Sequence, residues 1–192
     1  YVPEVDAHVT LMEMGGRYLL NPPYHNGAAN EPYYQLALDN GWHVSPTNNE
    51  DNHADKYCSA RVVASGQWAA LNGIMTYSGI WAESNASDTK AMAQGKMMQA
   101  LRARRTFSVE DKATSFSDML RLKFTVNTAA GVKWMGSRGL TATDVAGSAM
   151  RLELTRNAGL ILSSVQLITN GGAVARDLPL SGPGVTLSPD GK

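Results

Sequence analysis

Asp51 and His53 stand two positions apart in the polar stretch PTNNEDNH, residues 46–53. On an extended chain, residues i and i+2 point to the same side of the backbone. A carboxylate and an imidazole on one side could bind the same divalent cation, and this pair of ligands suits zinc, manganese or iron. The same pair also arises by chance in exposed polar loops, so the spacing alone leaves a metal site and a solvated loop both open.

The residues before this stretch have the pattern of a strand, a helix and a second strand. Residues 8–14 (HVTLMEM) alternate as a strand does, and residues 43–49 (HVSPTNN) lead as a second strand into the polar stretch. Between them, residues 30–42 predict a helix, because Pro32 suits a first helical turn and Gly41 a left-handed stop. The three segments together predict a βαβ unit.

A βαβ unit would bring several of the polar residues together. In parallel sheets and barrels, reactive groups lie at the carboxyl ends of the strands. Glu13 ends the first predicted strand, while Asp51 and His53 follow the second. We therefore expect all three at one rim of the sheet, with Glu13 beside the metal ligands.

Residues 87–105 form the clearest predicted helix, with Ser87 or Asp88 as its cap and methionines on its buried side. Its last turn is basic, which suits the negative end of the helix dipole. Of these cations, Arg105 is the one that we expect at the rim, where it could contact a substrate phosphate. Residues 77–84 and 106–111 read as strands on either side of this helix.

The pattern changes after residue 113 to short alternating strands, which predict a small antiparallel β-sandwich of immunoglobulin-like type. The alternating segments are 120–127, 149–157 and 163–178, with a hairpin turn at the NGG of 170–172. We therefore divide the chain into residues 1–113 and 114–192. His8 and His43, in strand-like segments of the first part, are expected to be structural.

Composition narrows the classes of function. The 192 residues carry 17 basic and 17 acidic side chains, and this balance argues against a nucleic-acid-binding surface. No apolar run reaches the roughly 18 residues of a membrane-spanning helix. The single cysteine, Cys58, cannot form an internal disulfide. Because the chain starts without Met and in a strand-like pattern, we expect it to be part of a longer protein.

The stretch LALDNGWHVSPTNNEDNH (36–53), followed by ALRARRTFSVED (100–111) and FTVN (124–127), resembles the carboxyl-terminal half of the PHP family. These are metal-dependent phosphoesterases of the polymerase and histidinol phosphatase type. The resemblance implies an α/β fold, a partial (βα)7 PHP-type barrel followed by the β-sandwich. Asp51 and His53 match metal-ligand positions of the family. The implied cofactors are divalent Zn, Mn or Fe ions, whose number the sequence does not fix.

The activity implied by the resemblance is attack of a metal-bound hydroxide on a phosphorylated substrate. The family's amino-terminal ligands are absent from this sequence, so an upstream segment or another chain would have to complete the site. By analogy, the branch with this motif and a trailing β-domain is extracellular or on the cell surface.

Two other interpretations remain open. One is a non-catalytic surface or assembly protein that keeps the barrel as a scaffold and associates with itself through the β-domain. The other is a carbohydrate- or polymer-binding module in the sandwich, where only Trp134 stands out as an aromatic platform.

Overall fold

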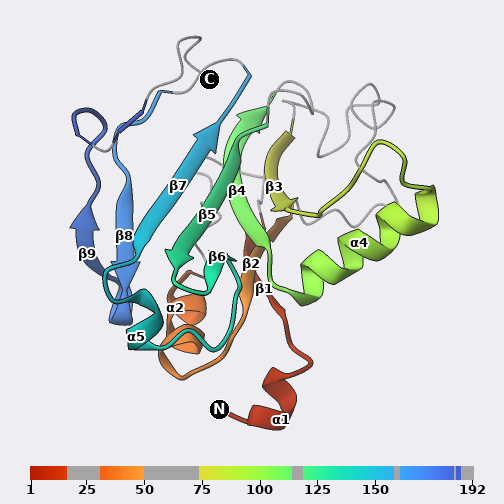
Figure 1. The fold of residues 1–192 in the computed structure, drawn as a ribbon, viewed down its shortest axis with the longest axis horizontal. Helices are drawn as coiled ribbons and strands as arrows, with labels where there is room; N and C mark the ends of the chain where they lie inside the picture. The colour runs from red at the N-terminus through yellow and green to blue at the C-terminus, as the bar shows by residue number, and fades with distance from the viewer. Residues whose placement is uncertain (17–30, 50–73, 114–118, 158–160, 184, 187–192) are drawn as a thin grey trace.

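The computed structural model describes residues 1–16, 31–49, 74–113, 119–157, 161–183 and 185–186. Within these ranges the chain is a mixed α/β structure of small sheets and short helices (Figure 1). One sheet is parallel and the others are antiparallel. None of the helices in these ranges is long and apolar enough to cross a membrane.

The first unit is the predicted strand, helix and strand. It consists of β1 (Leu11–Gly16), α2 (Glu31–Asp39) and β2 (Ser45–Asn49). β1 and β2 are parallel, with Glu13 opposite Thr47, so the predicted pairing is confirmed. The first strand starts at Leu11, later than predicted, because a short helix, α1 (Pro3–Asp6), continues into a turn in which the His8 and Val9 backbones bond to the Val5 carbonyl.

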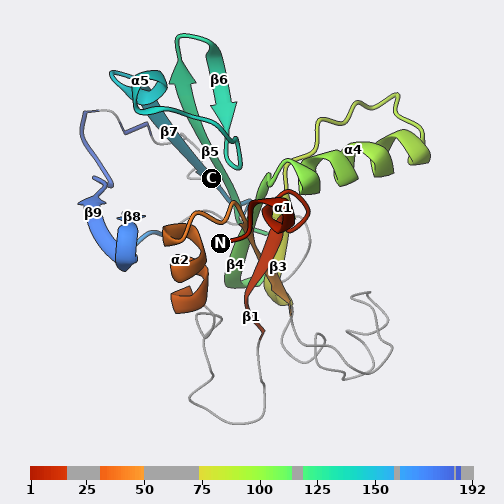
Figure 2. The same cartoon turned by 90° about the horizontal axis from the view of Figure 1, so that it is seen from below.

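The second unit differs from the first, because its two strands are antiparallel. β3 (Ile74–Ile80) and β4 (Thr106–Ala113) are antiparallel although α4 (Lys90–Arg102) lies between them in sequence. A helix that crosses between parallel strands packs on the sheet. Here α4 projects away from β3 and β4 and buries only Ala100 (Figure 2).

Two details of α4 correct the sequence-based predictions. Its cap is Thr89, whose hydroxyl accepts a hydrogen bond from the Met92 backbone, and not Ser87 or Asp88. The side chains predicted to be buried are exposed, since Met92 is 51% exposed, and Met97 and Met98 are exposed too. Hydrophobicity alone could not tell a core-facing helix from this projecting one.

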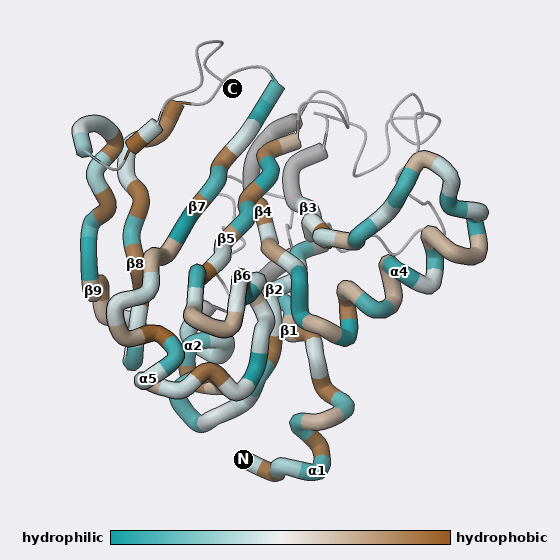
Figure 3. Tube along the Cα trace, in the orientation of Figure 1, coloured by the Kyte–Doolittle hydropathy of each residue, from teal (hydrophilic) through white to brown (hydrophobic). Residues whose placement is uncertain are grey.

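The third unit is an antiparallel sheet with β5 (Arg121–Thr128) in the centre, flanked by β6 (Gly131–Trp134) and β7 (Ala149–Thr155). A one-turn helix, α5 (Ala142–Val145), connects β6 to β7. Hydropathy alternates along β5 and β7, as predicted (Figure 3). Val126 is buried, whereas Met150, opposite it on β7, is 57% exposed.

A separate hairpin completes the described fold. β8 (Gln166–Thr169) and β9 (Ala173–Asp177) pair antiparallel around the turn η4 (Asn170–Gly172). Both glycines of this turn have positive φ, which side-chain-bearing residues rarely adopt. The hairpin predicted from NGG is therefore confirmed. Its tip lies against α2, where the Gly171 backbone donates to Asp39 Oδ2 at 2.7 Å.

Polar side chains join β2 to the β3–β4 pair. Thr106 Oγ1 donates to the Pro46 carbonyl at 2.7 Å, and Asn48 Nδ2 donates to the Val109 carbonyl at 3.3 Å. The earlier residue of β2 contacts the earlier residue of β4, and the later residue contacts the later one. β4 therefore runs beside β2 in the same direction. Ser78 Oγ also bonds to the Asn48 backbone, accepting from its nitrogen at 2.7 Å.

The hydrophobic core crosses the predicted division at residue 113. Its buried members Tyr77, Phe107 and Val109 contact Leu120 and Leu122 from the second part. The Tyr77 hydroxyl accepts a hydrogen bond from the Leu120 backbone at 2.6 Å. β5 is thus packed on the β3–β4 pair.

Candidate functional site

The parallel β1–β2 pair leads into the predicted metal-binding stretch. Glu13 lies exposed on β1, opposite Thr47 of β2. β2 ends at Asn49, two positions before Asp51 in the sequence. Asp51 and His53 themselves lie outside the described residues. The part of the prediction that the structure describes is therefore the pair of strands that precedes them.

Arg105 lies apart from this region. It stands one position before β4, whose first residue, Thr106, bonds to the beginning of β2. The metal-binding stretch follows the opposite, carboxyl end of β2. The Arg105 guanidinium forms an ion pair with Glu83 Oε1 at 2.7 Å and lies 5.5 Å from the centre of the Trp134 ring. The structure thus does not bring Arg105 to the end of β2 from which the predicted ligands follow.

A group of charged side chains that sequence reasoning missed surrounds Asp6, whose exposed fraction is 0%. Oδ1 of Asp6 accepts a hydrogen bond from the His43 backbone at 2.7 Å. Oδ2 accepts from Arg138 at 2.7 Å and pairs with Nδ1 of His43 at 2.9 Å. The Tyr1 hydroxyl donates to the same oxygen at 3.3 Å. We call Asp6, His43, Arg138 and Arg104 the Asp6 cluster.

Arg104 connects the cluster to α4. It is buried and has a positive φ of 60° in the turn after the helix. Its guanidinium donates to the backbone carbonyls of His43, Asp6 and Arg102. Three chain segments therefore meet on one side chain, for which the sequence favoured compensation of the helix dipole.

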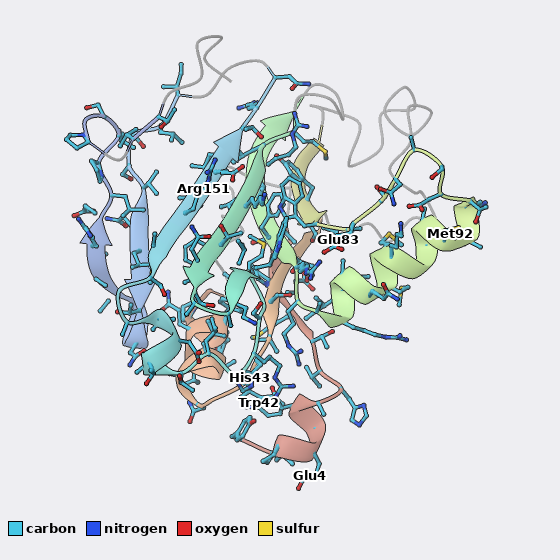
Figure 4. All side chains as sticks on the ribbon, in the orientation of Figure 1. Glu4, Trp42, His43, Glu83, Met92 and Arg151 are labelled. Carbon is cyan, nitrogen blue, oxygen red and sulfur yellow. The ribbon has the colours of Figure 1, made fainter. Side chains whose placement is uncertain are left out.

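The loop after β6 fits closely over the same turn. Gly136 has a positive φ of 81°, and a Cβ atom there would overlap the carbonyl of Arg104. This close approach lets the next residues of the loop carry Arg138 to Asp6. Figure 4 shows His43 and Trp42 beside α1, at the end of the sheets where these segments converge.

The surroundings of Asp6 favour its ionised form. The hydrogen bond from the His43 backbone, the His43 side chain and the charge of Arg138 lower the pKa of Asp6 to about 2, against the opposing effect of burial. Burial lowers the pKa of Arg104. The cluster therefore combines one carboxylate with two guanidinium groups.

A carboxylate that orients a histidine is also the arrangement of many general bases. In the Asp6 cluster, however, both carboxylate oxygens are engaged in joining separate chain segments, and Arg138 shares the oxygen that contacts the His43 ring. His43 thus has the structural role predicted for it. The cluster holds the start of the chain, the beginning of β2 and the loop after β6 in place.

Within the described ranges, no group of three or more His, Cys, Asp or Glu side chains is arranged to hold a metal ion. The predicted ligands Asp51 and His53 are not among the residues covered. Compared with known proteins, the chain matches no family model, no curated protein and no solved structure at a significant level. The resemblance to the PHP family therefore rests on the sequence motifs alone.

Proposed function

We propose that this chain is the carboxyl-terminal portion of a PHP-type metal-dependent phosphoesterase, with Asp51 and His53 as metal ligands. The parallel pairing of β1 and β2 carries the proposal, because Asp51 and His53 follow the carboxyl end of a parallel strand in the sequence. Ligands in α/β folds bind at such carboxyl ends. The proposal includes the finer fold, a partial PHP-type barrel over residues 1–113 and an immunoglobulin-like sandwich over 114–192.

The donor set suits the proposed chemistry. An aspartate and a histidine supply one anionic oxygen and one neutral nitrogen, which fit zinc, manganese or iron. A bound divalent cation would supply an activated water and offset charge on the phosphoryl oxygens. Asp51 must be ionised and His53 neutral to bind it. Glu13, exposed on the neighbouring strand, would add negative charge to the same rim.

Two ligands from this chain do not complete a catalytic centre. Further ligands would come from an upstream segment or another chain, as the family resemblance implies. The expected substrate is a phosphoester, and the expected location is extracellular or on the cell surface. Both follow from the family resemblance.

Metal analysis with matched variants tests the proposal. The chain is incubated with Mn²⁺ or Zn²⁺, desalted and analysed for metal per chain, and its hydrolysis of p-nitrophenyl phosphate and bis-p-nitrophenyl phosphate is followed. We expect bound metal in the wild type and its loss in the double variant Asp51→Ala/His53→Ala. The matched control is Asp177→Ala/His8→Ala, which removes the same two side-chain types at exposed positions outside this stretch and should retain metal.

Equal metal content in the two double variants would overturn the assignment of Asp51 and His53. A wild type that takes up no metal would favour the non-catalytic scaffold, and self-association measured by sedimentation would then be the property to examine.

A further inference from the structure

A row of side chains in contact crosses from the segment after β3 to β7, with Trp134 at its centre. Its members, in order of contact, are Glu83, Arg105, Trp134, Lys123, Glu153 and Arg151. We call this set the Trp134 row. Figure 4 labels Glu83 and Arg151, which stand at its two ends.

Two cations contact the central indole. Nζ of Lys123 lies 4.4 Å from the centre of the Trp134 ring, and the Arg105 guanidinium carbon lies 5.5 Å from it. Cations over an aromatic face are attracted by its negative quadrupole. The indole therefore holds both cations at one place on the surface, although they come from β5 and from the residue before β4.

The other members lie on one face of the sheet. Lys123 is opposite Glu153, and Thr125 is opposite both Arg151 and Trp134. Residues opposite each other on neighbouring strands share a face, as do residues two apart on one strand. Exposed Asn127 and Thr155 therefore belong to the same face. They add neutral hydrogen-bonding groups beside the charges.

The ion pairs in the row are weak and accessible. The side chains of Glu83 and Arg151 are 74% and 68% exposed, and those of Arg105 and Lys123 are each 27% exposed. Lys123 and Glu153 are 3.8 Å apart, near the limit for an ion pair. Exposed pairs contribute about 0–1 kcal/mol, so a carboxylate from outside could replace Glu83 or Glu153 with little loss. With three cations and two carboxylates, the row has a net charge of +1.

A second tryptophan, Trp81, lies beside Trp134. The ring centres of Trp81 and Trp134 are 6.3 Å apart. Nε1 of Trp81 donates to the Leu122 carbonyl at 2.6 Å, which anchors Trp81 to β5. The sequence suggested only an isolated tryptophan in the second part of the chain. The fold places a tryptophan from the first part beside it.

We propose that the face bearing the Trp134 row binds an acidic polysaccharide whose carboxylates contact Arg105, Lys123 and Arg151. The half-buried indole offers an apolar edge to a sugar ring, and Asn127 and Thr155 can bond to sugar hydroxyls. Double-stranded nucleic acid fits less well, because its phosphates, about one per 1.7 Å of helix, would meet Glu83 and Glu153 on a chain without net charge. This binding does not depend on the proposed metal chemistry.

Charge-removing variants test the inference with polygalacturonate as the probe and titration calorimetry as the measurement. Lys123→Gln and Arg151→Gln should each weaken binding, by roughly two- to fivefold for an exposed charge pair. Glu153→Gln and Glu83→Gln should strengthen binding by a similar factor, because they remove the competing carboxylates. A variant that only lost folding stability would not bind more tightly.

The matched controls change charge by the same amount elsewhere on the surface. Glu4→Gln and Arg176→Gln alter exposed residues outside the row and should leave binding unchanged. Equal effects of row and control variants would overturn the inference, as would absence of wild-type binding or tighter binding to single-stranded poly(dT). Neutral dextran should bind far more weakly. Retention of polygalacturonate binding in Asp51→Ala/His53→Ala would separate this site from the proposed metal site.

Discussion

Arg138 and Asp6 are 132 positions apart in the chain, yet a guanidinium nitrogen of Arg138 lies 2.7 Å from Oδ2 of Asp6. The contact joins the short helix that precedes β1 to the loop that follows β6. Together with Arg104, it fixes the entrance to the β1–α2–β2 unit on the rest of the molecule. The buried charges of Asp6 and Arg104 therefore hold the segment that precedes β1 in place.

Replacing Asp6 with Asn should lower stability markedly, because Asn retains the shape but removes the carboxylate beside buried Arg104 and partly exposed Arg138. We expect a large decrease in the urea midpoint. Arg138→Met should have a smaller effect, since the His43 bonds to Asp6 remain. Asp177→Asn, at an exposed position, is the control and should be close to wild type. An Asp6→Asn midpoint equal to that of the control would show that the cluster does not stabilise the fold.

Stability should also depend on pH through Asp6. Its pKa is about 2 in the folded chain, below the roughly 3.9 of an unfolded aspartate. The unfolded state therefore takes up the proton first as pH falls, and the folded state loses the contribution of this group between about pH 5 and pH 2. Urea unfolding across this range should show a falling midpoint. The decrease should be shallower in Asp6→Asn, and equal slopes in the two proteins would contradict the assignment.

The Trp81 hydrogen bond offers a test of how firmly β5 is attached to the β3–β4 pair. Trp81→Phe retains an aromatic ring but leaves the Leu122 carbonyl without its 2.6 Å donor. Losing one partner of a part-buried bond should cost about 1–3 kcal/mol of unfolding free energy. Trp42→Phe is a suitable control, because Trp42 makes an edge-to-face contact with Tyr1 that a phenyl ring can replace. Equal costs in both variants would mean that ring size, and not the bond, is what matters.

Local patterns predicted the local structure well. Gly41, with a φ of 86°, follows α2 as expected, and the NGG turn forms its hairpin. Each of these depends on a few neighbouring residues whose backbone preferences are strong. The parallel pairing of β1 and β2 was also predictable, because a helix of this length between two strands favours that connection.

Contacts between distant segments were not predictable in the same way. The sequence predicted a strand on either side of the helix at 87–105 but not how they pair, and in the structure α4 projects outward while β3 and β4 are antiparallel. Asp6 and Arg138 belong to no motif, and the stretch around Arg104 gave no sign of its contacts, since they depend on where three turns meet. Trp81 and Trp134 lie on opposite sides of the predicted division, so their proximity required the fold.

The proposed metal site should respond to pH in the direction set by its histidine. His53 binds a cation only when its imidazole is neutral, and an ordinary histidine has a pKa of about 6.5. Metal bound per chain should therefore decrease as the pH is lowered from 8 to 5. Asp51→Asn should weaken binding throughout this range, because it removes the anionic ligand. Metal uptake that is constant from pH 8 to 5, or equal in wild type and Asp51→Asn, would place the metal on other residues.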